Sequence, residues 1–456
     1  MDSQAQICTT DHRSRAATLR FLLIGPFDPH CGEYTFIAPP LGVWRLAGYL
    51  ESHGVETMVF DPNLCDGSPP EKLSALLRSR SWDLIGVSTT AMTLRYDLQL
   101  AHLVRAVLPR VLLIAGGMEA TFNPQRTLEL APFDVAVLGE GEQPLVALAD
   151  RLRSGAELVG VPGTALRTRE GSIVRFNQMA LTQVQLRHAI LTTPYERMPY
   201  PAYWKRLERS CRVGELPFKA DREARLAEIR SVRLITLNYC PMACSFCSST
   251  NFLHSAQGSV ARVARLSAEE CLAMMVRIMA AQPETRTIIF QDDIFVFTKD
   301  QRILPLCEAI VDAKSRGDLP RDLQFISTNR IDSMTPERLA AMRRAGFRVL
   351  GFGVENFSKR VLHEFNKAQI HPHIETTLHE ARRQGITPFL DLILTSPGCD
   401  IEDLTLTIRR AFHWIRNECE IGIYPYVIPF TGAALVMARR PQTPGRSNLR
   451  RCRGSE

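Results

Sequence analysis

The sequence predicts an α/β protein of two modules: a doubly wound (Rossmann-like) N-terminal domain followed by a partial (β/α)6 barrel. Short runs of Val, Ile and Leu alternate along the chain with longer segments whose apolar residues recur at helical spacing. Continuous apolar strands of this kind are typical of parallel sheets that helices cover on both faces. The length of 456 residues also favours two globular units over one simple core.

The first module is predicted over residues 18–153. Its candidate strands are TLRFLLIG (18–25), VETMVF (55–60), WDLIGVS (82–88), RVLLIAG (110–116) and FDVAVLG (133–139). Glycines follow several strand ends, at Gly25, at Gly116 and Gly117, and in GEGE at 139–142. Ligands of open α/β sheets bind beyond the carboxyl ends of the strands, where small residues permit close backbone approach. Because no G-x-G-x-x-G pattern is present, spacing alone leaves a ligand crevice and simple tight turns equally open.

A connector is predicted over residues 154–230 and the second module over 231–435. Helix starts are marked by Ser267 with Glu270, a capping-box pattern, and by Thr335 before Pro336, while Gly346 ends the second of these helices. Six strand-then-helix units predict a partial barrel, with its chemistry at the C-terminal ends of the strands. The six candidate strands are SVRLITLN (231–238), RTIIF (286–290), LQFIST (323–328), RVLGFGV (348–354), TPFLDLIL (387–394) and IGIYPYVI (421–428).

Charge and composition exclude several classes of function. The net charge is +7, but residues 439–456 hold six arginines and one glutamate and so supply +5 of it. The body of the chain shows no basic stripe with interleaved aromatics, which argues against nucleic-acid binding. We predict that residues 1–17 and the basic tail 436–456 are disordered.

The compartment can also be predicted. No apolar run reaches the roughly 18 residues of a membrane span, and residues 1–17 lack the apolar centre of a signal peptide. Outside one loop, the cysteines are scattered singly, as expected of reduced thiols. We therefore predict a cytoplasmic protein.

That loop is CPMACSFC, residues 240–247, which places Cys240, Cys244 and Cys247 in a C-x3-C-x2-C pattern directly after the first strand of the second module. A structural zinc site usually has four ligands in two pairs, and a redox dithiol has C-x-x-C beside a helix start. Three thiolates on a cubane iron–sulfur cluster would instead leave one iron open for another ligand.

CPMACSFC resembles the signature of radical S-adenosylmethionine (SAM) enzymes. The resemblance implies that Cys240, Cys244 and Cys247 bind a [4Fe–4S] cluster, that SAM chelates the open iron, and that Phe246 lies by the adenine. Strand-end segments extend the resemblance and imply a SAM or substrate site at IIFQDDIFVF (288–297), STNRID (327–332) and GFGVEN (351–356). The implied residues are Asp292, Asp293, Asn329, Arg330 and Glu355. Turn or cap roles for the aspartates, and a structural hydrogen bond for Glu355, remain open.

The first module is similar to the cobalamin-binding domain that precedes the radical barrel in one large subfamily. The similar segments are residues 38–63, GGMEAT (116–121) and VLGEGE (137–142). The resemblance implies cobalamin contacts at Ser88, Thr89, Gly116, Gly117, Gly139, Glu140 and Gly141. Many cobalamin domains carry Asp-x-His-x-x-Gly after the first strand; Asp28, His30 and Gly32 are one residue short of it. We therefore expect His30 to be a loop histidine and not a cobalt ligand.

Together these resemblances imply a cobalamin-dependent radical SAM methyltransferase. Its expected substrate is an unactivated carbon or phosphorus centre of a specialised metabolite such as an antibiotic, with phosphinate P-methylation as one candidate. Expected partners are that small molecule and an electron donor of the flavodoxin or ferredoxin type. No catalytic side chain is required, since the cofactors carry the chemistry. Polar candidates at the barrel mouth are Asp391, Thr395 and Tyr426.

Two alternatives stay open. The same cofactors could serve an oxidative cyclisation or rearrangement of the tetrapyrrole type. The chain could also be a non-enzymatic regulator that binds cobalamin or zinc.

Overall fold

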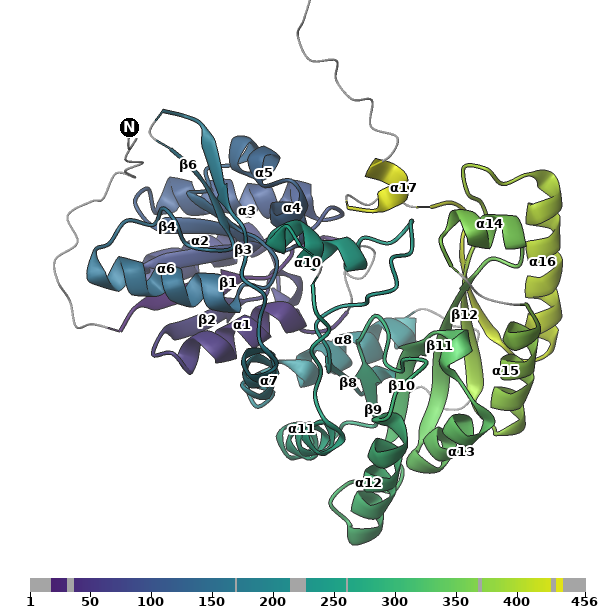
Figure 1. The fold of residues 1–456 in the computed structure, drawn as a ribbon. Helices are drawn as coiled ribbons and strands as arrows, with labels where there is room; N and C mark the ends of the chain where they lie inside the picture. The colour runs from purple at the N-terminus through teal and green to yellow at the C-terminus, as the bar shows by residue number, and fades with distance from the viewer. Residues whose placement is uncertain are drawn as a thin grey trace, which may run out of the picture.

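A computed structural model describes residues 18–30, 37–168, 170–213, 227–259, 261–367, 371–427 and 432–437. Two sheets, each built mainly of parallel strands with helices against them, make up the described chain (Figure 1). The predicted α/β class is therefore confirmed. The ends predicted to be disordered lie outside the described residues, apart from the last two residues of α17 (Ala434–Met437).

The first sheet has the strand order β2-β1-β3-β4-β5-β6-β7. Its parallel part consists of β1 (Arg20–Ile24), β2 (Glu56–Phe60), β3 (Leu84–Ser88), β4 (Leu112–Gly116) and β5 (Val135–Val137). The chain reverses direction across the sheet between β1 and β3, which is the crevice position of doubly wound folds. The antiparallel strands β6 (Thr164–Arg167) and β7 (Ile173–Phe176) continue this sheet into the stretch predicted as a connector.

Residues typical of helix ends mark the start of one helix and the end of another beside the first sheet. Ser68 caps α2 (Pro69–Ser79), which has proline at its first position, and Gly155 ends α6 (Glu142–Ser154) in a left-handed conformation. The other elements are α1 (Leu41–Glu51), the 3-10 turn η1 (Pro62–Leu64), α3 (Leu94–Val107), α4 (Met118–Phe122) and α5 (Pro124–Leu130). Apolar side chains fill both faces of the sheet, as parallel strands require.

The second sheet has six parallel strands in the order β13-β12-β11-β10-β9-β8, so it forms an open partial barrel as predicted. The strands are β8 (Ser231–Leu234), β9 (Thr287–Phe290), β10 (Gln324–Asn329), β11 (Phe347–Glu355), β12 (Thr387–Ile393) and β13 (Glu420–Tyr424). The helices are α10 (Ser249–Gln257), α11 (Ala268–Ala281), α12 (Ile303–Arg316), α13 (Pro336–Ala345), α14 (Lys359–Glu364), α15 (His371–Arg383) and α16 (Ile401–Arg416), with a 3-10 turn η2 (Ile331–Ser333). The capping box of Ser267 with Glu270, and the cap residues Thr335 and Gly346, lie where the sequence predicts them.

Aromatic side chains on helices and loops between the sheets protect the free edge of the barrel at β8. The segment contains α7 (Gln183–Leu191) and α8 (Tyr200–Val213). The Tyr195 hydroxyl donates to the Arg233 carbonyl at 2.9 Å, and the Trp204 indole N–H donates to the Ser231 carbonyl at 3.0 Å. The β8 edge is thereby blocked against pairing with another strand.

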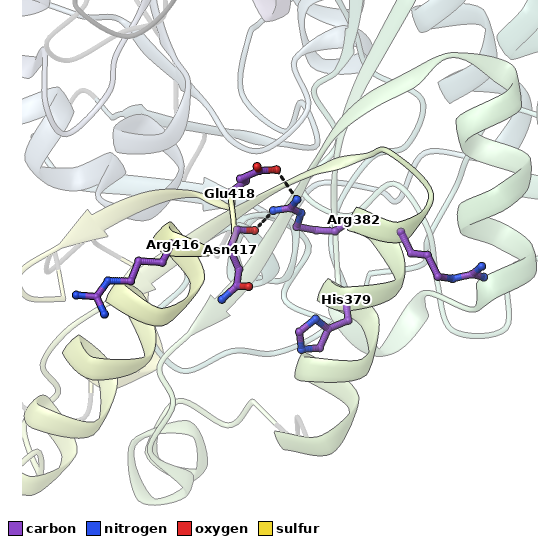
Figure 2. Close-up of a pocket in the computed structure, with 6 residues that line it drawn as sticks. His379, Arg382, Arg416, Asn417 and Glu418 are labelled. Carbon is purple, nitrogen blue, oxygen red and sulfur yellow. Dashed lines mark hydrogen bonds and ion pairs between the residues drawn. The ribbon is translucent and has the colours of Figure 1, made fainter.

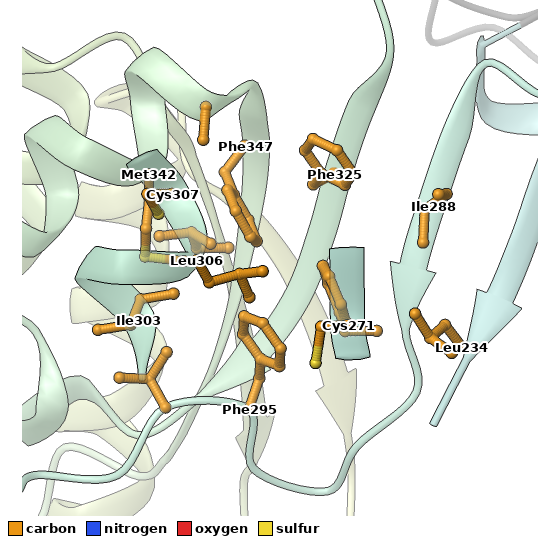
Figure 3. Close-up of a cluster of buried hydrophobic side chains, with 14 of the residues drawn as sticks. Leu234, Cys271, Ile288, Phe295, Ile303, Leu306, Cys307, Phe325, Met342 and Phe347 are labelled. Carbon is orange, nitrogen blue, oxygen red and sulfur yellow. The ribbon is translucent and has the colours of Figure 1, made fainter. Parts of the chain in front are cut away.

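Four phenylalanines form the centre of the barrel core between the sheet and its helices (Figure 3). Phe347 lies 5.8 Å from Phe290, 6.0 Å from Phe295 and 5.3 Å from Phe325 between ring centroids, and it is fully buried. Rings at these separations gain specific aromatic attraction in addition to hydrophobic burial.

We predict that Phe347→Ala lowers the free energy of unfolding by about 3–5 kcal/mol, because it opens a cavity among three other rings. Urea unfolding followed by tryptophan fluorescence measures the change. Phe412→Ala is the matched control, because Phe412 on α16 is 59% exposed, and we expect a change within about 0.5 kcal/mol for it. Equal effects of the two substitutions would contradict the packing described here.

Candidate functional site

The three cysteines lie together in the loop between β8 and α10. Cys240, Cys244 and Cys247 are free and partly buried. Burial raises the pKa of the Cys240 thiol to about 12, and the charges of Asp293, Cys244 and Cys247 add to that shift. No set of three His, Cys, Asp or Glu side chains in the described chain converges on a single metal ion. A cluster of several irons does not require its sulfurs to meet at one point, so the loop fits such a cluster, whose positive charge would ionise the thiols.

Neighbouring segments fix the backbone of this loop. The Ser245 N–H donates to the Phe365 carbonyl at 3.0 Å, and its hydroxyl donates to the Glu364 carbonyl at 2.7 Å. The Asn366 amide donates to the carbonyl of Ala243, which has a φ of 53°. The turn after α14 therefore holds the centre of the cysteine loop.

Two further contacts close the loop. The Thr250 hydroxyl on α10 donates to the Cys240 carbonyl at 3.0 Å. The Leu435 N–H on α17 donates to the Ser245 carbonyl at 2.7 Å. The described end of the chain thus contributes to the same loop.

Asp292 and Asp293 lie on opposite sides of the chain after β9. The buried Asp292 carboxylate accepts from the backbone N–H groups of Thr236 at 2.6 Å and Leu237 at 3.1 Å, and from the Thr236 hydroxyl. Burial raises the pKa of Asp292 to about 6, although these bonds lower it. Asp292 therefore fastens the chain that leads from β8 into the cysteine loop.

Asp293 points towards the cysteines. Asp293 is exposed, but desolvation by the surrounding protein raises the pKa of its carboxyl, while a hydrogen bond from Ser249 lowers it. Its charge contributes to the raised pKa of Cys240. Of the two aspartates, Asp293 is therefore the one whose charge acts on the cysteine loop.

Asn329 and Arg330 also differ in this way, since one is buried on the helix side and the other faces the cysteines. The buried Asn329 amide donates to the Ser327 carbonyl at 3.1 Å, and its own oxygen has no hydrogen-bond partner in the described chain. Asn329 shares the helix-facing side of β10 with Ser327 and Phe325. Arg330 forms a bidentate pair with Asp332 at 2.9 and 2.8 Å, and the charges of Cys244 and Cys240 help to raise its pKa. Arg330 is thus the member of this pair that reaches the cysteines.

Glu355 lies at the end of β11 in a left-handed conformation, with φ 65°, and is buried. Its carboxylate forms an ion pair with the equally buried Lys367. The Lys367 ammonium lies 5.9 Å from the centre of the Phe246 ring, which packs edge-on against Phe365 at 5.0 Å. Burial raises the pKa of Cys244, while Lys367 and then Arg330 lower it.

Lys367 is a functional candidate that sequence reasoning missed. It lies in a turn twelve residues after Glu355, and no periodicity or cap pattern marks it. A buried cation beside the cysteine loop suits the carboxylate of an amino-acid ligand.

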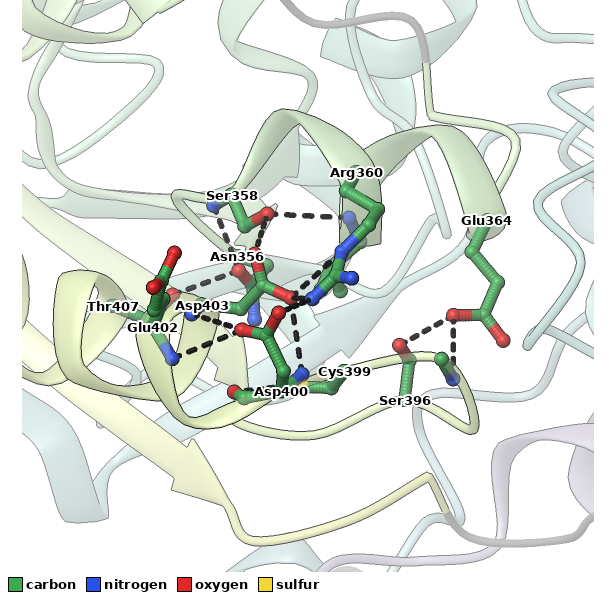
Figure 4. A network of polar contacts seen from close by, with 12 residues as sticks. Asn356, Ser358, Arg360, Glu364, Ser396, Cys399, Asp400, Glu402, Asp403 and Thr407 are labelled. Carbon is green, nitrogen blue, oxygen red and sulfur yellow. Dashed lines mark hydrogen bonds and ion pairs between the residues drawn. The ribbon is translucent and has the colours of Figure 1, made fainter.

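A polar network holds the strand end that carries Glu355 (Figure 4). The Asn356 amide donates to the Ile393 carbonyl at 2.9 Å, and its oxygen accepts from the Thr407 hydroxyl at 2.7 Å and the Ser358 N–H at 2.8 Å. The ends of β11 and β12 and the helix α16 are thereby joined. These bonds fix the left-handed residue that precedes Asn356.

The glycines of the first module have two different roles. Gly117 has a φ of 95°, and a Cβ there would lie 2.6 Å from the Thr89 carbonyl oxygen. Buried Thr89 is itself occupied, because its N–H and hydroxyl both donate to the Gly116 carbonyl, at 2.7 and 2.8 Å. At Gly116, by contrast, a Cβ would meet nothing within 4 Å. Gly116 and its register partner Ser88 therefore border the open end of the crevice.

The GEGE turn lies where the two modules meet. A Cβ at Gly139, where φ is 70°, would collide with Gln178 and with Ala256 of α10, and one at Gly141 would press on Leu46 at 3.1 Å. The strand-end glycines therefore allow close packing as well as ligand approach.

Glu140 carries a buried carboxyl group without a hydrogen-bond partner among the described residues. Neither of its carboxylate oxygens has a hydrogen-bond partner in the described chain, and Arg45 lies 3.9 Å away while approaching Glu142 at 2.5 Å. Burial and the charge of Glu142 raise the pKa of Glu140 to about 8, and Arg45 lowers it. Unpartnered buried acceptors fit the amide N–H groups at the rim of a cobalamin ring.

His30 is exposed, and its ring lies 6.4 Å from Tyr96 in an edge-on arrangement. Cys31 and Gly32, the rest of the shortened cobalt-ligand pattern, lie outside the described residues. Among the barrel-mouth candidates, Thr395 donates to the Pro425 carbonyl at 2.8 Å, and Tyr426 is 63% exposed.

The first module contacts the helix that follows the cysteine loop. Helix α4, which follows Gly117, packs on α10, which follows the cysteines, with Phe122 and Phe252 6.2 Å apart between ring centroids (Figure 1). The Gly139 N–H donates to Thr121 of α4 at 2.9 Å. One short helix contact therefore joins the two predicted cofactor sites.

A separate surface pocket of about 410 Å³ lies at the C-terminal ends of α15 and α16 (Figure 2). Its lining includes Arg382, which pairs with Glu418. Because these helices run antiparallel to the strands, the pocket lies at the opposite end of the barrel from the cysteine loop. It is not part of this site.

Comparison with protein families agrees with both halves of the site. The B12 binding domain model matches residues 30–149, and the Radical SAM superfamily model matches residues 234–411. Fold and site together define an enzyme that uses a [4Fe–4S] cluster, SAM and cobalamin. The chain thus combines an N-terminal segment that matches the B12 binding domain model with a second segment that matches the Radical SAM superfamily model.

Two curated relatives span most of the chain. An uncharacterized methyltransferase of Pyrococcus horikoshii is 25% identical over 401 residues, covering 87% of this chain and 77% of the relative. The anaerobic magnesium-protoporphyrin IX monomethyl ester cyclase of Rubrivivax gelatinosus is 23% identical over 426 residues, covering 89% and 68%.

Solved structures share the fold. The radical SAM methyltransferase TsrM from Kitasatospora setae, with cobalamin and a [4Fe–4S] cluster bound, superposes with a TM-score of 0.69 at 19% identity, over 92% of this chain and 74% of that chain. The cobalamin-dependent radical SAM enzyme OxsB gives 0.65 at 18% identity, over 86% and 51%. No described helix combines the length and apolar character that a membrane span requires.

We predict that Gly116→Ala weakens cobalamin retention at least tenfold without loss of stability, because the added methyl group enters the open end of the crevice. The visible absorbance of the purified protein and its melting temperature measure the two effects. Gly42→Ala on α1, where a Cβ also meets nothing within 4 Å, serves as the control and should retain cobalamin. Full retention in Gly116→Ala would contradict this placement of the crevice.

Proposed function

We propose that this enzyme transfers a methyl group from methylcobalamin to an unactivated carbon or phosphorus centre of a small specialised metabolite. The contact of α4 with α10 carries the proposal, because it brings the open end of the cobalamin crevice to the loop of the three cysteines. When bound, the cluster and SAM supply a carbon radical, and cobalamin supplies the methyl group. Antibiotic-type metabolites, including phosphinates, are the substrate class we favour.

The residues of the chain bind and orient the reactants. We propose that Cys240, Cys244 and Cys247 hold the cluster and that Phe246 lies by the adenine of SAM. We propose that Lys367 binds the SAM carboxylate and that Asp293 binds its ammonium group, since the charges of both side chains act on the cysteines. This neighbourhood of fixed charges binds SAM in one orientation.

The cobalamin site would be formed by Ser88, Gly116 and Glu140, while Gly117, Gly139 and Gly141 permit the turns around it. The redox chemistry needs one external electron per cleavage of SAM. We propose a donor of the flavodoxin or ferredoxin type, in the cytoplasm.

Product analysis tests the proposal directly. The reconstituted enzyme is incubated without oxygen with a reductant, candidate metabolites and SAM that carries a CD3 methyl group. Methyl transfer adds a CD3 group to the product and forms S-adenosylhomocysteine. 5′-Deoxyadenosine without any labelled product would contradict it.

Oxidative cyclisation is a second candidate function. It is favoured by the similarity to the Rubrivivax cyclase over 89% of the chain. It predicts 5′-deoxyadenosine together with an oxidised product that contains no deuterium, so the same experiment separates the two.

We predict that Lys367→Met weakens SAM binding at least tenfold, because it removes a buried cation and leaves the Glu355 carboxylate buried without its partner. Equilibrium dialysis with labelled SAM measures the dissociation constant. Lys314→Met is the control, since Lys314 is a partly buried cation on α12 outside the site and donates to the Leu323 carbonyl. A stable Lys367→Met protein that binds SAM as tightly as the wild type would contradict this role.

A further inference from the structure

The inward side of the last three barrel strands contains a carboxylate between two glycines. Asp391 on β12 pairs in register with Gly353 on β11 and with Gly422 on β13. A Cβ at Gly422 would lie 3.2 Å from Asp391 Oδ1, and one at Gly353 would collide with the ends of Glu355 and Lys367. The two glycines therefore let the Glu355–Lys367 pair and the Phe389 ring come close to Asp391, where a larger residue would collide with them.

Asp391 has no hydrogen bond or ion pair within the described ranges, unlike the other charged groups near it. Lys367 forms an ion pair with Glu355, and Arg330 forms one with Asp332. The other ionisable groups that act on Asp391 are Glu355 and Lys367, and burial raises the pKa of Asp391 to about 6. Asp391 is therefore a partly buried carboxylate that forms no ion pair with any described residue on this side of the barrel.

Two aromatic side chains flank this carboxylate. Phe389 precedes Asp391 by two residues on the same face of β12, and a Cβ at Gly422 would lie 3.1 Å from its ring. Tyr424 follows Gly422 by two residues on β13, and it lies close enough to Asp391 and Glu355 for both to raise its pKa, after burial. Tyr424 remains 46% exposed.

Asp391 neighbours Glu355 and Lys367, but it is not among the charges that act on Cys240 and Cys244. The charges that act on Cys240 and Cys244 include Asp293, Lys367, Arg330 and Glu355. Glu355 pairs with Leu392 after a bulge, whereas Asp391 pairs with Gly353, so Asp391 is further from the C-terminal strand ends. In a barrel this position is deeper in the lumen than the strand end that carries Glu355.

We propose that Asp391 binds a protonated amine of the substrate and that Phe389 and Tyr424 pack against an adjacent planar or apolar group. The substrate class is therefore an amine-bearing metabolite with a ring or hydrocarbon next to the nitrogen. An ammonium ion paired with a partly buried carboxylate is held more strongly than in the same pair in water. This inference rests on the proposed function for the location of the substrate, but not on the nature of the transferred group.

Binding of three matched probes tests it: phenethylamine, phenethyl alcohol and 3-phenylpropionate. The probes are titrated by calorimetry into enzyme reconstituted with cluster, cobalamin and SAM, without a reductant. We expect phenethylamine to bind the wild type at least tenfold more tightly than either other probe. Asp391→Asn should abolish that preference while its affinity for SAM stays unchanged.

Two controls keep the result interpretable. Asp312→Asn makes the same chemical change on the exposed surface of α12 and should retain the preference. In the wild type itself, affinity for phenethylamine should fall as the pH drops below about 6, because Asp391 then becomes protonated and loses its charge. This second measurement does not depend on whether a variant folds.

The proposal is overturned if the wild type shows no preference for the amine, whether through equal binding or none, or if Asp391→Asn keeps the preference. It is also overturned if Asp391→Asn weakens SAM instead, since Asp391 would then belong to the cofactor site. Since no reductant is present, these outcomes are independent of methyl transfer. A negative result in the labelled-methyl experiment would therefore not decide whether the enzyme prefers the amine.

Discussion

The backbone of the cysteine loop is the constraint on which the site depends. Between β8 and α10 the chain passes through Cys240, Cys244 and Cys247 without regular secondary structure, so its position must come from other segments. Asp292 fastens the approach to the loop, the turn after α14 fixes its centre at Ser245, and Leu435 donates to it from the end of the described chain. A loop held at this many points can keep three thiols in one arrangement before any cluster binds.

The same loop explains why the two modules meet where they do. Helix α10 follows the last cysteine in the chain and packs on α4, which follows the glycines at the end of β4. Gly139 has no room for a side chain because Gln178 and Ala256 approach it, and the Gln178 N–H donates to the Ala256 carbonyl at 2.9 Å. Strand-end glycines therefore serve both the crevice and the interface. The methyl transfer that we propose requires this contact between the two modules to be short.

Much of the fold could be predicted because its signals are local. Apolar runs gave the parallel strands, and the capping box at Ser267 and Glu270 lies where expected. The β6–β7 hairpin was not predicted, since two strands of four residues carry little pattern and are defined by pairing with β5. Lys367 was missed for a similar reason, because its burial beside Glu355 arises from the turn after α14 packing against the cysteine loop.

The motif residues also divide in a way that their spacing does not reveal. Successive residues of a strand point to opposite faces, so of each adjacent pair only one can reach the lumen. Asp293 and Arg330 interact electrostatically with the cysteine thiols, whereas Asp292 and Asn329 are buried on the helix side of the same strand ends. The residue that faces away is still required, because Asp292 holds the chain that positions Cys240. The two residues of such a pair therefore have different roles, one in binding and one in keeping the loop in place. A substitution at the first position should weaken binding, whereas one at the second should disturb the position of the loop.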